Sequence, residues 1–156
     1  MEFVSNFVFS ASNLILIMAY IFKQQLNLKD LADLDSQPKR ILIYEPESYL
    51  AALYRHYLSE HNFDIKHCSN LAEVGKIIKD FQPHLLIFSA DGDSFKYPGM
   101  ISSLSRAFPG LQLLTTGYNL SNQSIKTLMD AGVLGHLNRR LSRPRDVADV
   151  VNAVLQ

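Results

Sequence analysis

Between residues 38 and 156 the chain alternates short apolar runs with longer segments whose apolar residues recur at helical spacing. The short runs, which we interpret as strands, cover residues 40–44, 63–68, 85–88, 111–115 and 133–137. The longer segments, which we interpret as helices, cover residues 48–60, 71–80, 98–108, 122–131 and 144–155. Strict alternation with short connections produces right-handed βαβ units and one parallel sheet covered by helices on both faces. The sequence therefore predicts a doubly wound α/β domain with five parallel strands.

Local features refine this prediction. Residues 63–68 alternate apolar and polar side chains, which indicates a strand that is exposed on one face or lies at an edge, whereas residues 85–88 are apolar throughout. Ser48 is expected to cap the first helix, and the pair Ser69-Asn70 the second. Gly132 is expected to end the helix before the last strand.

The first 37 residues have a different texture. Residues 3–22 contain no charged side chain, and about twenty helical residues span the roughly 30 Å of a bilayer's hydrocarbon core. We expect a hydrophobic helix there and a polar linker up to residue 37, because Pro38 is disfavoured inside a helix. Membrane anchoring, association with a partner or second copy, and a true start at Met18 stay open as alternatives. In each case we expect the segment to contribute nothing to the folding of 38–156.

Composition excludes several classes of function. The 15 basic and 15 acidic residues give a formal charge of zero, so the chain lacks the broad attraction of a basic domain for nucleic acid. One cysteine, Cys68, excludes a disulfide framework and indicates a reducing, cytoplasmic setting, in which residues 3–22 could tether the domain to the inner face of the membrane. The five histidines lack the paired spacing of a zinc helix.

In open parallel sheets the functional crevice lies beyond the carboxyl ends of the strands. The first such turn reads Glu45-Pro46-Glu47-Ser48, with no glycine and two negative charges. A dinucleotide-binding turn or a P-loop requires glycines whose backbone cradles phosphate, and two acids would repel it. The sequence therefore excludes both kinds of phosphate site at this turn.

The segment from 39 to 156 resembles a response-regulator receiver domain of the CheY-like type. The resemblance rests on KRILIYEPESYLAALYRHYL, QPHLLIFS, LQLLTTG and MDAGVLGHLNRR, in that order along the chain. It implies a flavodoxin-like fold with strand order 2-1-3-4-5 and a signalling role in a two-component or phosphorelay system. It also implies a pocket in which two acids hold Mg²⁺, an aspartate accepts phosphate, and a hydroxyl and a lysine assist.

This sequence keeps only part of that pocket. The positions that match it, counted from the end of each strand and from Pro83, are Glu45, Pro46, Ser89, Thr116 and Arg139. Proline thus replaces the second acid, serine the phosphoacceptor, and arginine the lysine. Serine cannot form an acyl phosphate, and Mg²⁺ prefers several oxygen ligands, so we expect weak or absent Mg²⁺ binding and no cofactor. The resemblance is therefore to a degenerate pseudo-receiver that is not an enzyme.

Two side-chain assignments in this pocket stay open. Glu45 and Arg139 could form an ion pair that closes the crevice, or remain two solvated charges. Asp91, two residues after Ser89, is the candidate for an offset phosphoacceptor. We favour a turn role for it, because SADGDS has a turn composition in which aspartates bond to nearby backbone N–H groups.

The remaining candidates form a surface. His136 occupies the place of the receivers' aromatic switch residue, and Arg140 and Arg143 belong to the densest basic cluster of the chain. We expect these three residues to belong to a face that binds a protein partner, either a kinase, a regulator or a second copy, without phosphorylation. The alternatives are a working phosphoacceptor that uses Asp91 and a sensor domain that binds a small ligand.

Overall fold

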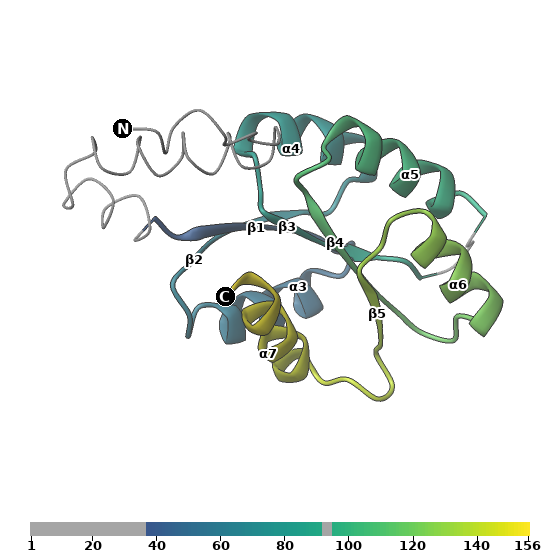
Figure 1. Ribbon diagram of the computed structural model, residues 1–156. Coiled ribbons are helices and arrows are strands. Elements are labelled where there is room, and N and C mark those ends of the chain that lie inside the picture. Colours follow the sequence, from purple (N-terminus) through teal and green to yellow (C-terminus); the bar gives the residue numbers. More distant parts are fainter. Residues whose placement is uncertain (1–36, 92–94) are drawn as a thin grey trace, which may run out of the picture. The chain divides into compact units, whose positions relative to one another are not determined.

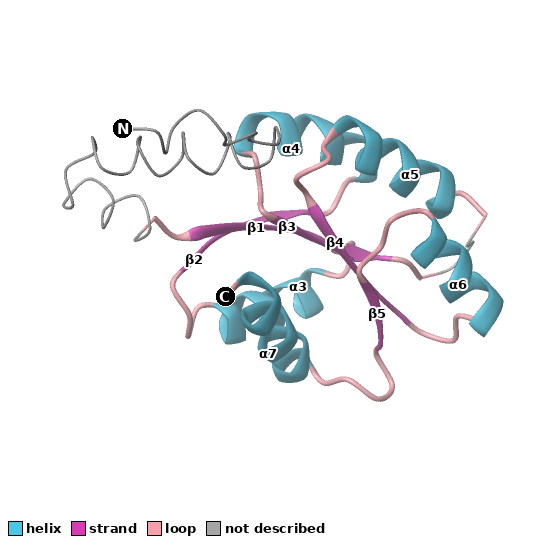
Figure 2. Ribbon diagram, viewed as in Figure 1, coloured by secondary structure: helices cyan, strands magenta, loops and turns pink. Residues whose placement is uncertain are grey.

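Five parallel strands form one sheet in the order β2-β1-β3-β4-β5, as Figures 1 and 2 show for this computed structural model. The structure describes residues 37–91 and 95–156. Its strands are β1 (Lys39–Tyr44), β2 (Phe63–Cys68), β3 (Leu85–Ser89), β4 (Gln112–Gly117) and β5 (Gly135–Asn138). The predicted flavodoxin-like strand order and parallel sheet are therefore confirmed.

Helices cover both faces of the sheet (Figure 1). The helical elements are α3 (Ser48–Leu58), the 3₁₀ turn η1 (Leu71–Glu73), α4 (Val74–Phe81), α5 (Tyr97–Ala107), α6 (Asn122–Asp130) and α7 (Pro144–Leu155). Helices α4, α5 and α6 lie on one face, and α3 and α7 pack together on the other. This is the two-sided covering that the alternating sequence predicts.

The side chains of each central strand point alternately into two hydrophobic cores, as a two-residue period requires. In β1, Leu42 belongs to the core under α4, α5 and α6, and its neighbour Ile43 belongs to the core under α3 and α7. Leu86 and Ile87 of β3 divide in the same way. Strands buried on both faces must be apolar throughout, which explains the continuous apolar runs.

The edge strand and most element ends match the sequence predictions. Strand β2 lies at an edge and alternates between exposed and half-buried residues. The Asn70 side chain caps η1 by accepting from the Ala72 N–H. Helix α6 ends just before Gly132, whose φ of +117° lies in the left-handed region.

The prediction that Ser48 caps the first helix is wrong. Glu47 occupies the N-cap position and makes no capping bond with its side chain, so Ser48 is the first helical residue. The turn before the helix is formed by residues 45–47, where the Glu47 N–H donates to the Glu45 carboxylate at 3.0 Å, and the helix begins one residue earlier than a Ser48 cap would require. The turn after β1 is thus organised by Glu45, a residue of the predicted pocket.

The predictions for the first part of the chain concern residues that lie, apart from Gln37, outside the described part. These are the hydrophobic helix at 3–22, the start at Met18 and the linker that ends at residue 37. The chain divides into two units between Gln37 and Pro38, and of the first unit the structure describes Gln37 alone. Within the described residues, no helix has the length and apolar character needed to cross a membrane.

Gly132 and Gly75 offer a matched pair of substitutions for testing this packing. A Cβ on Gly132 would lie 2.4 Å from Ser105 Oγ, on a backbone that L-residues avoid, whereas a Cβ on Gly75 in α4 would meet nothing within 4 Å. We expect Gly132→Ala to lower the free energy of unfolding by more than about 1 kcal/mol. Gly75→Ala should raise it by roughly 0.5 kcal/mol. Urea unfolding measures both, and equal effects would contradict the assignment of Gly132 as the strained helix stop.

Candidate functional site

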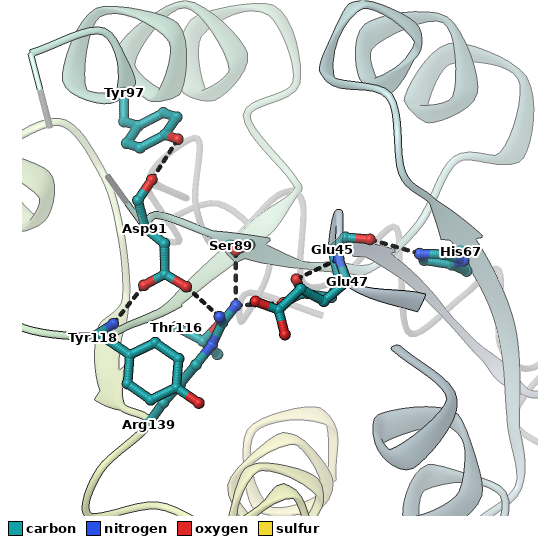
Figure 3. Close-up of polar contacts among 9 residues, drawn as sticks. All are labelled: Glu45, Glu47, His67, Ser89, Asp91, Tyr97, Thr116, Tyr118 and Arg139. Carbon is teal, nitrogen blue, oxygen red and sulfur yellow. Dashed lines mark hydrogen bonds and ion pairs between the residues drawn. The ribbon is translucent and has the colours of Figure 1, made fainter. Parts of the chain in front are cut away.

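The polar residues that follow four of the strands meet at the carboxyl edge of the sheet (Figure 3). Ser89 at the end of β3 pairs with Thr116 of β4, and Gly117 of β4 pairs with Asn138 at the end of β5. Glu45 follows β1 directly. Because the strand register is fixed by the apolar runs, these short polar segments necessarily converge at one place.

Arg139 fills the centre of this site. One terminal nitrogen, Nη2, donates to the Glu45 carboxylate, to Ser89 Oγ at 2.7 Å and to Thr116 Oγ1 at 3.2 Å. The other, Nη1, donates to the Asp91 carboxylate. The side chains of Arg139 and Glu45 are 3% and 1% exposed, and that of Asp91 is 31% exposed. The guanidinium group therefore lies in protein interior and is held between two carboxylates.

The structure shows partners for both side chains whose roles the sequence left open. The Glu45–Arg139 ion pair is present. The Asp91 carboxylate bonds to Arg139 and to the backbone N–H of Tyr118, 27 residues away. Its predicted turn role concerns the N–H groups of residues 92–94, which lie outside the described residues, and stays a prediction.

Glu45 is fixed from several sides. Its carboxylate accepts from the Glu47 N–H at 3.0 Å, its backbone oxygen accepts from His67 Nε2 at 2.8 Å, and its own N–H donates to Cys68 O at 3.0 Å. Pro46, the residue at the position of the second acid, is exposed at the turn. The first acid of the predicted pocket is thus a buried, hydrogen-bonded carboxylate, and the residue at the second position offers no carboxylate.

Burial dominates the titration behaviour of this site. It raises the pKa of Glu45, although the Glu47 N–H and the charge of Arg139 act in the opposite direction. It also raises the pKa of the Tyr54 phenol, which α3 places close enough to Arg139 and Thr116 for both to act on it. Burial lowers the pKa of His136, with Asp91 opposing and Arg139 reinforcing the effect. At neutral pH His136 is therefore the uncharged imidazole.

Three tyrosines complete the site and were missed by sequence reasoning. The Tyr118 ring lies 5.3 Å from the Arg139 guanidinium carbon, and its N–H binds Asp91. The Tyr97 hydroxyl donates to Asp91 O at 2.8 Å, and Tyr54 approaches from α3. Tyr118 could have been found, because it directly follows the β4 segment that already contributes Thr116. Tyr54 gave no signal, since a tyrosine on an apolar helix face is indistinguishable from ordinary core.

The three residues of the predicted partner face differ in exposure. Arg140 and Arg143 are exposed, and Arg143 forms a surface ion pair with Asp146 at 3.1 Å. His136 is half-buried, and its Nδ1 is hydrogen bonded with Thr115 Oγ1 at 2.9 Å. Between the two arginines, Leu141 is 83% exposed. The loop after β5 therefore presents an apolar side chain flanked by cations.

Metal ligands are sparse. No group of three or more His, Cys, Asp or Glu side chains in residues 37–91 and 95–156 is arranged to hold a metal ion. At the site itself the oxygens of Glu45 and Asp91 both face the guanidinium group of Arg139. A resident Mg²⁺ would need these oxygens together with further oxygen ligands, so the donor set does not fit this ion while Arg139 is in place.

Comparisons with known proteins identify the fold. No protein-family model matches the sequence. No curated protein matches it either. Among solved structures, an orphan response regulator of H. pylori, HP1043, matches with a TM-score of 0.70 at 14% identity, covering 77% of this chain and 98% of its own.

Two further structures agree. A CheY-like receiver domain protein from Methanospirillum hungatei matches with a TM-score of 0.67 at 16% identity, covering 76% of this chain and 94% of its own. A putative pilus assembly-related protein from Burkholderia pseudomallei matches with a TM-score of 0.63 at 23% identity, covering 74% and 87%. The domain therefore has the fold of response-regulator receiver domains.

Replacing Arg139 with glutamine tests its role in the site. Glu45 would be left as a buried carboxylate facing Asp91 without a cation, and breaking a buried pair costs about 3–5 kcal/mol. We expect that loss in urea unfolding of Arg139→Gln at pH 7. Burial raises the pKa of Glu45 and the charge of Arg139 opposes this, so the variant raises this pKa further, and its folded state takes up a proton at higher pH than the wild type or the unfolded chain. Stability is then present at low pH and is lost as the pH rises, so the penalty should shrink on acidification.

The exposed Arg143→Gln, which breaks only the surface pair with Asp146, serves as the matched control. Exposed ion pairs contribute little to stability. This variant should therefore have the wild-type free energy of unfolding both at pH 7 and at acidic pH. An Arg139→Gln protein with wild-type stability, or one whose penalty grows on acidification, would contradict the buried-pair assignment.

Proposed function

We propose that this domain is a receiver-like signalling module that acts by protein–protein contact and does not take up phosphate. The observation that carries the proposal is the guanidinium of Arg139 between Glu45 and Asp91. It occupies the region where the resemblance to receivers implies metal binding and phosphoryl transfer. The guanidinium of Arg139, already paired and hydrogen bonded, takes the place that a bound metal ion has in that pocket.

The chemistry of Ser89 supports this proposal. Its hydroxyl oxygen accepts from Arg139 Nη2 at 2.7 Å. A nucleophilic hydroxyl needs an adjacent base to take its proton, whereas Arg139 is a permanent cation that withdraws electron density from the oxygen. Ser89 is also 4% exposed. It is therefore positioned as a hydrogen-bond acceptor that helps to hold Arg139, and not as an acceptor of phosphate.

An offset phosphoacceptor at Asp91 is the second candidate function. The Asp91 carboxylate is partly exposed, which favours this candidate. Each of its oxygens is already bonded, one to Arg139 and the other to the Tyr118 N–H. Attack on a phosphodonor by either oxygen would compete with the bond that this oxygen already accepts, without a metal to offset the charge of the incoming phosphate. We therefore rank this candidate, and the binding of a small ligand at the same crevice, below the protein-contact function.

The proposed output lies on the loop after β5 and its neighbouring helices. Arg139, Asp91 and Tyr118 connect the segments that follow β3, β4 and β5 through hydrogen bonds and one ring contact. A ligand shifts a conformational equilibrium only by its differential affinity for two states, and here the internal contacts already favour one state. The partner face of His136, Arg140 and Arg143 then keeps one conformation and can bind its partner without phosphorylation.

Phosphorylation is tested by intact-mass measurement after incubation with acetyl phosphate and Mg²⁺. We expect no mass increase, because Ser89 cannot form an acyl phosphate and Asp91 is paired. A receiver domain with the complete acid set provides the positive control. A gain of one phosphate that disappears in Asp91→Asn would establish the offset phosphoacceptor and overturn the proposal.

Charge reversal tests the partner face. The double variant Arg140→Glu, Arg143→Glu should lose the complexes that the wild-type chain forms, measured by pull-down and by sedimentation for self-association. Reversal of Arg55 and Lys76, exposed cations on α3 and α4, changes the net charge equally and is the matched control. If the first variant keeps every partner and its self-association, the face is inert and the proposed output is wrong.

A further inference from the structure

A groove of about 480 Å³ lies at the opposite end of the sheet from Arg139. It is formed where the chain leaves α4 and α5 and enters β3 and β4, and its apolar lining includes Ile78, Pro83, Phe108 and Leu111. Small-molecule sites commonly have volumes of about 300–1,000 Å³ with mostly apolar walls. The groove thus has the size and the lining of a site for a small ligand, at a place that the proposed signalling function does not use.

The polar side chains of this groove favour one sign of charge. Arg40 and Lys79 are the cations among its described lining residues, and none of these residues is acidic. Arg40 is held in place because its Nε donates to Gln82 O at 2.9 Å. The end of a guanidinium that carries the two terminal nitrogens can still bind a carboxylate or phosphate in a bidentate manner when Nε is engaged.

His84 adds a directed donor. Its Nδ1 accepts from the Arg40 N–H at 2.9 Å, so in the neutral ring the proton is on Nε2. Burial, together with the nearby charges of Arg40 and Lys39, lowers the pKa of His84 and keeps the ring neutral at pH 7. The same histidine also lines a neighbouring hollow of about 220 Å³, whose only described cation is Lys39. The Nε2–H is thus a fixed donor at the boundary of two hollows that both contain cations.

We propose that this groove is a binding site for a small anionic amphiphile, a molecule with a carboxylate or phosphate group on an apolar body. Arg40, Lys79 and the His84 Nε2–H bind the anionic group, and the apolar body lies against Phe108, Leu111 and their neighbours. The site is separate from the crevice at Arg139, so its occupation is independent of the proposed function there.

A structural role for the cations is the competing explanation. Lys79 lies in the last turn of α4, where a positive charge offsets the partial negative charge of a helix C-terminus. The last turns of both helices are, however, already closed by backbone bonds, from Gln82 N–H to Ile78 O at 2.8 Å and from Phe108 N–H to Leu104 O at 2.9 Å. If these cations only stabilise the helix ends, removing them should not change ligand binding. If they bind the anionic group, removing them should weaken it.

The proposal is tested on the full chain by NMR titration with octanoate, with neutral octanol and cationic octylammonium as matched probes. We expect octanoate to shift the amide signals of residues 78–84 and 107–112. Octanol should bind about tenfold more weakly, and octylammonium should not bind there. In Arg40→Gln, Lys79→Gln the octanoate affinity should fall about tenfold, as expected for losing two partly exposed charge contacts.

The double variant Lys76→Gln, Lys126→Gln removes the same charge from exposed positions outside the groove and should bind octanoate like the wild type. Single Lys79→Gln, which leaves the Arg40 contacts intact, keeps the test valid if the first variant unfolds. Equal affinity for octanoate and octanol, shifts outside the two ranges, or unchanged affinity in the Arg40 and Lys79 variants would overturn the proposal.

Discussion

A single buried cation joins the segments that follow β1, β3, β4 and β5. Arg139, which follows β5, pairs with Glu45 and Asp91 and donates to Ser89 and Thr116, so the carboxyl ends of β1, β3 and β4 each contribute at least one acceptor. Moving two opposite charges out of water is costly, and the cost is recovered only when the hydrogen bonding is nearly complete. Here one donor, Nε, has no partner among the described residues, whereas both terminal nitrogens are bonded. The arrangement of the crevice thus depends on one side chain.

The charges of this crevice also limit what it can bind. Two carboxylates and one guanidinium leave the site with one net negative charge, in a region where Glu45 and Arg139 are almost fully buried. An anionic phosphodonor would meet that charge without a metal to offset it. At the other end of the sheet the situation is reversed, because cations and a neutral histidine line an apolar groove. The two ends of the same sheet are therefore suited to different partners.

Much of the fold could be predicted from the sequence because its cause is local. Strands buried on both faces must be apolar at every position, and an edge strand alternates, so β1, β3 and β2 could each be recognised and placed. Helix ends set by a backbone requirement, such as Gly132, were equally visible. Ser48 was misassigned because the turn before α3 is organised by a bond from the Glu47 N–H to the Glu45 side chain.

The site was only partly predictable, since the choice of partner depends on the fold. The Glu45–Arg139 pair followed from knowing which strand ends meet. The long-range contacts of the Asp91 carboxylate did not, because a turn composition describes neighbours in sequence, and these two partners lie 27 and 48 residues away. Tyr54 and Tyr118 contribute through their position in space, which no local pattern encodes.

The permanence of Arg139 in the crevice is measured most directly by its own side-chain N–H signals in NMR spectra, recorded with and without Mg²⁺. A guanidinium held between two carboxylates rotates slowly and exchanges slowly with water, so we expect resolved, protected Arg139 signals that Mg²⁺ leaves unchanged. Signals averaged by free rotation, or a loss of protection as Mg²⁺ is added, would show that the cation leaves the site and would contradict its role as a fixed occupant.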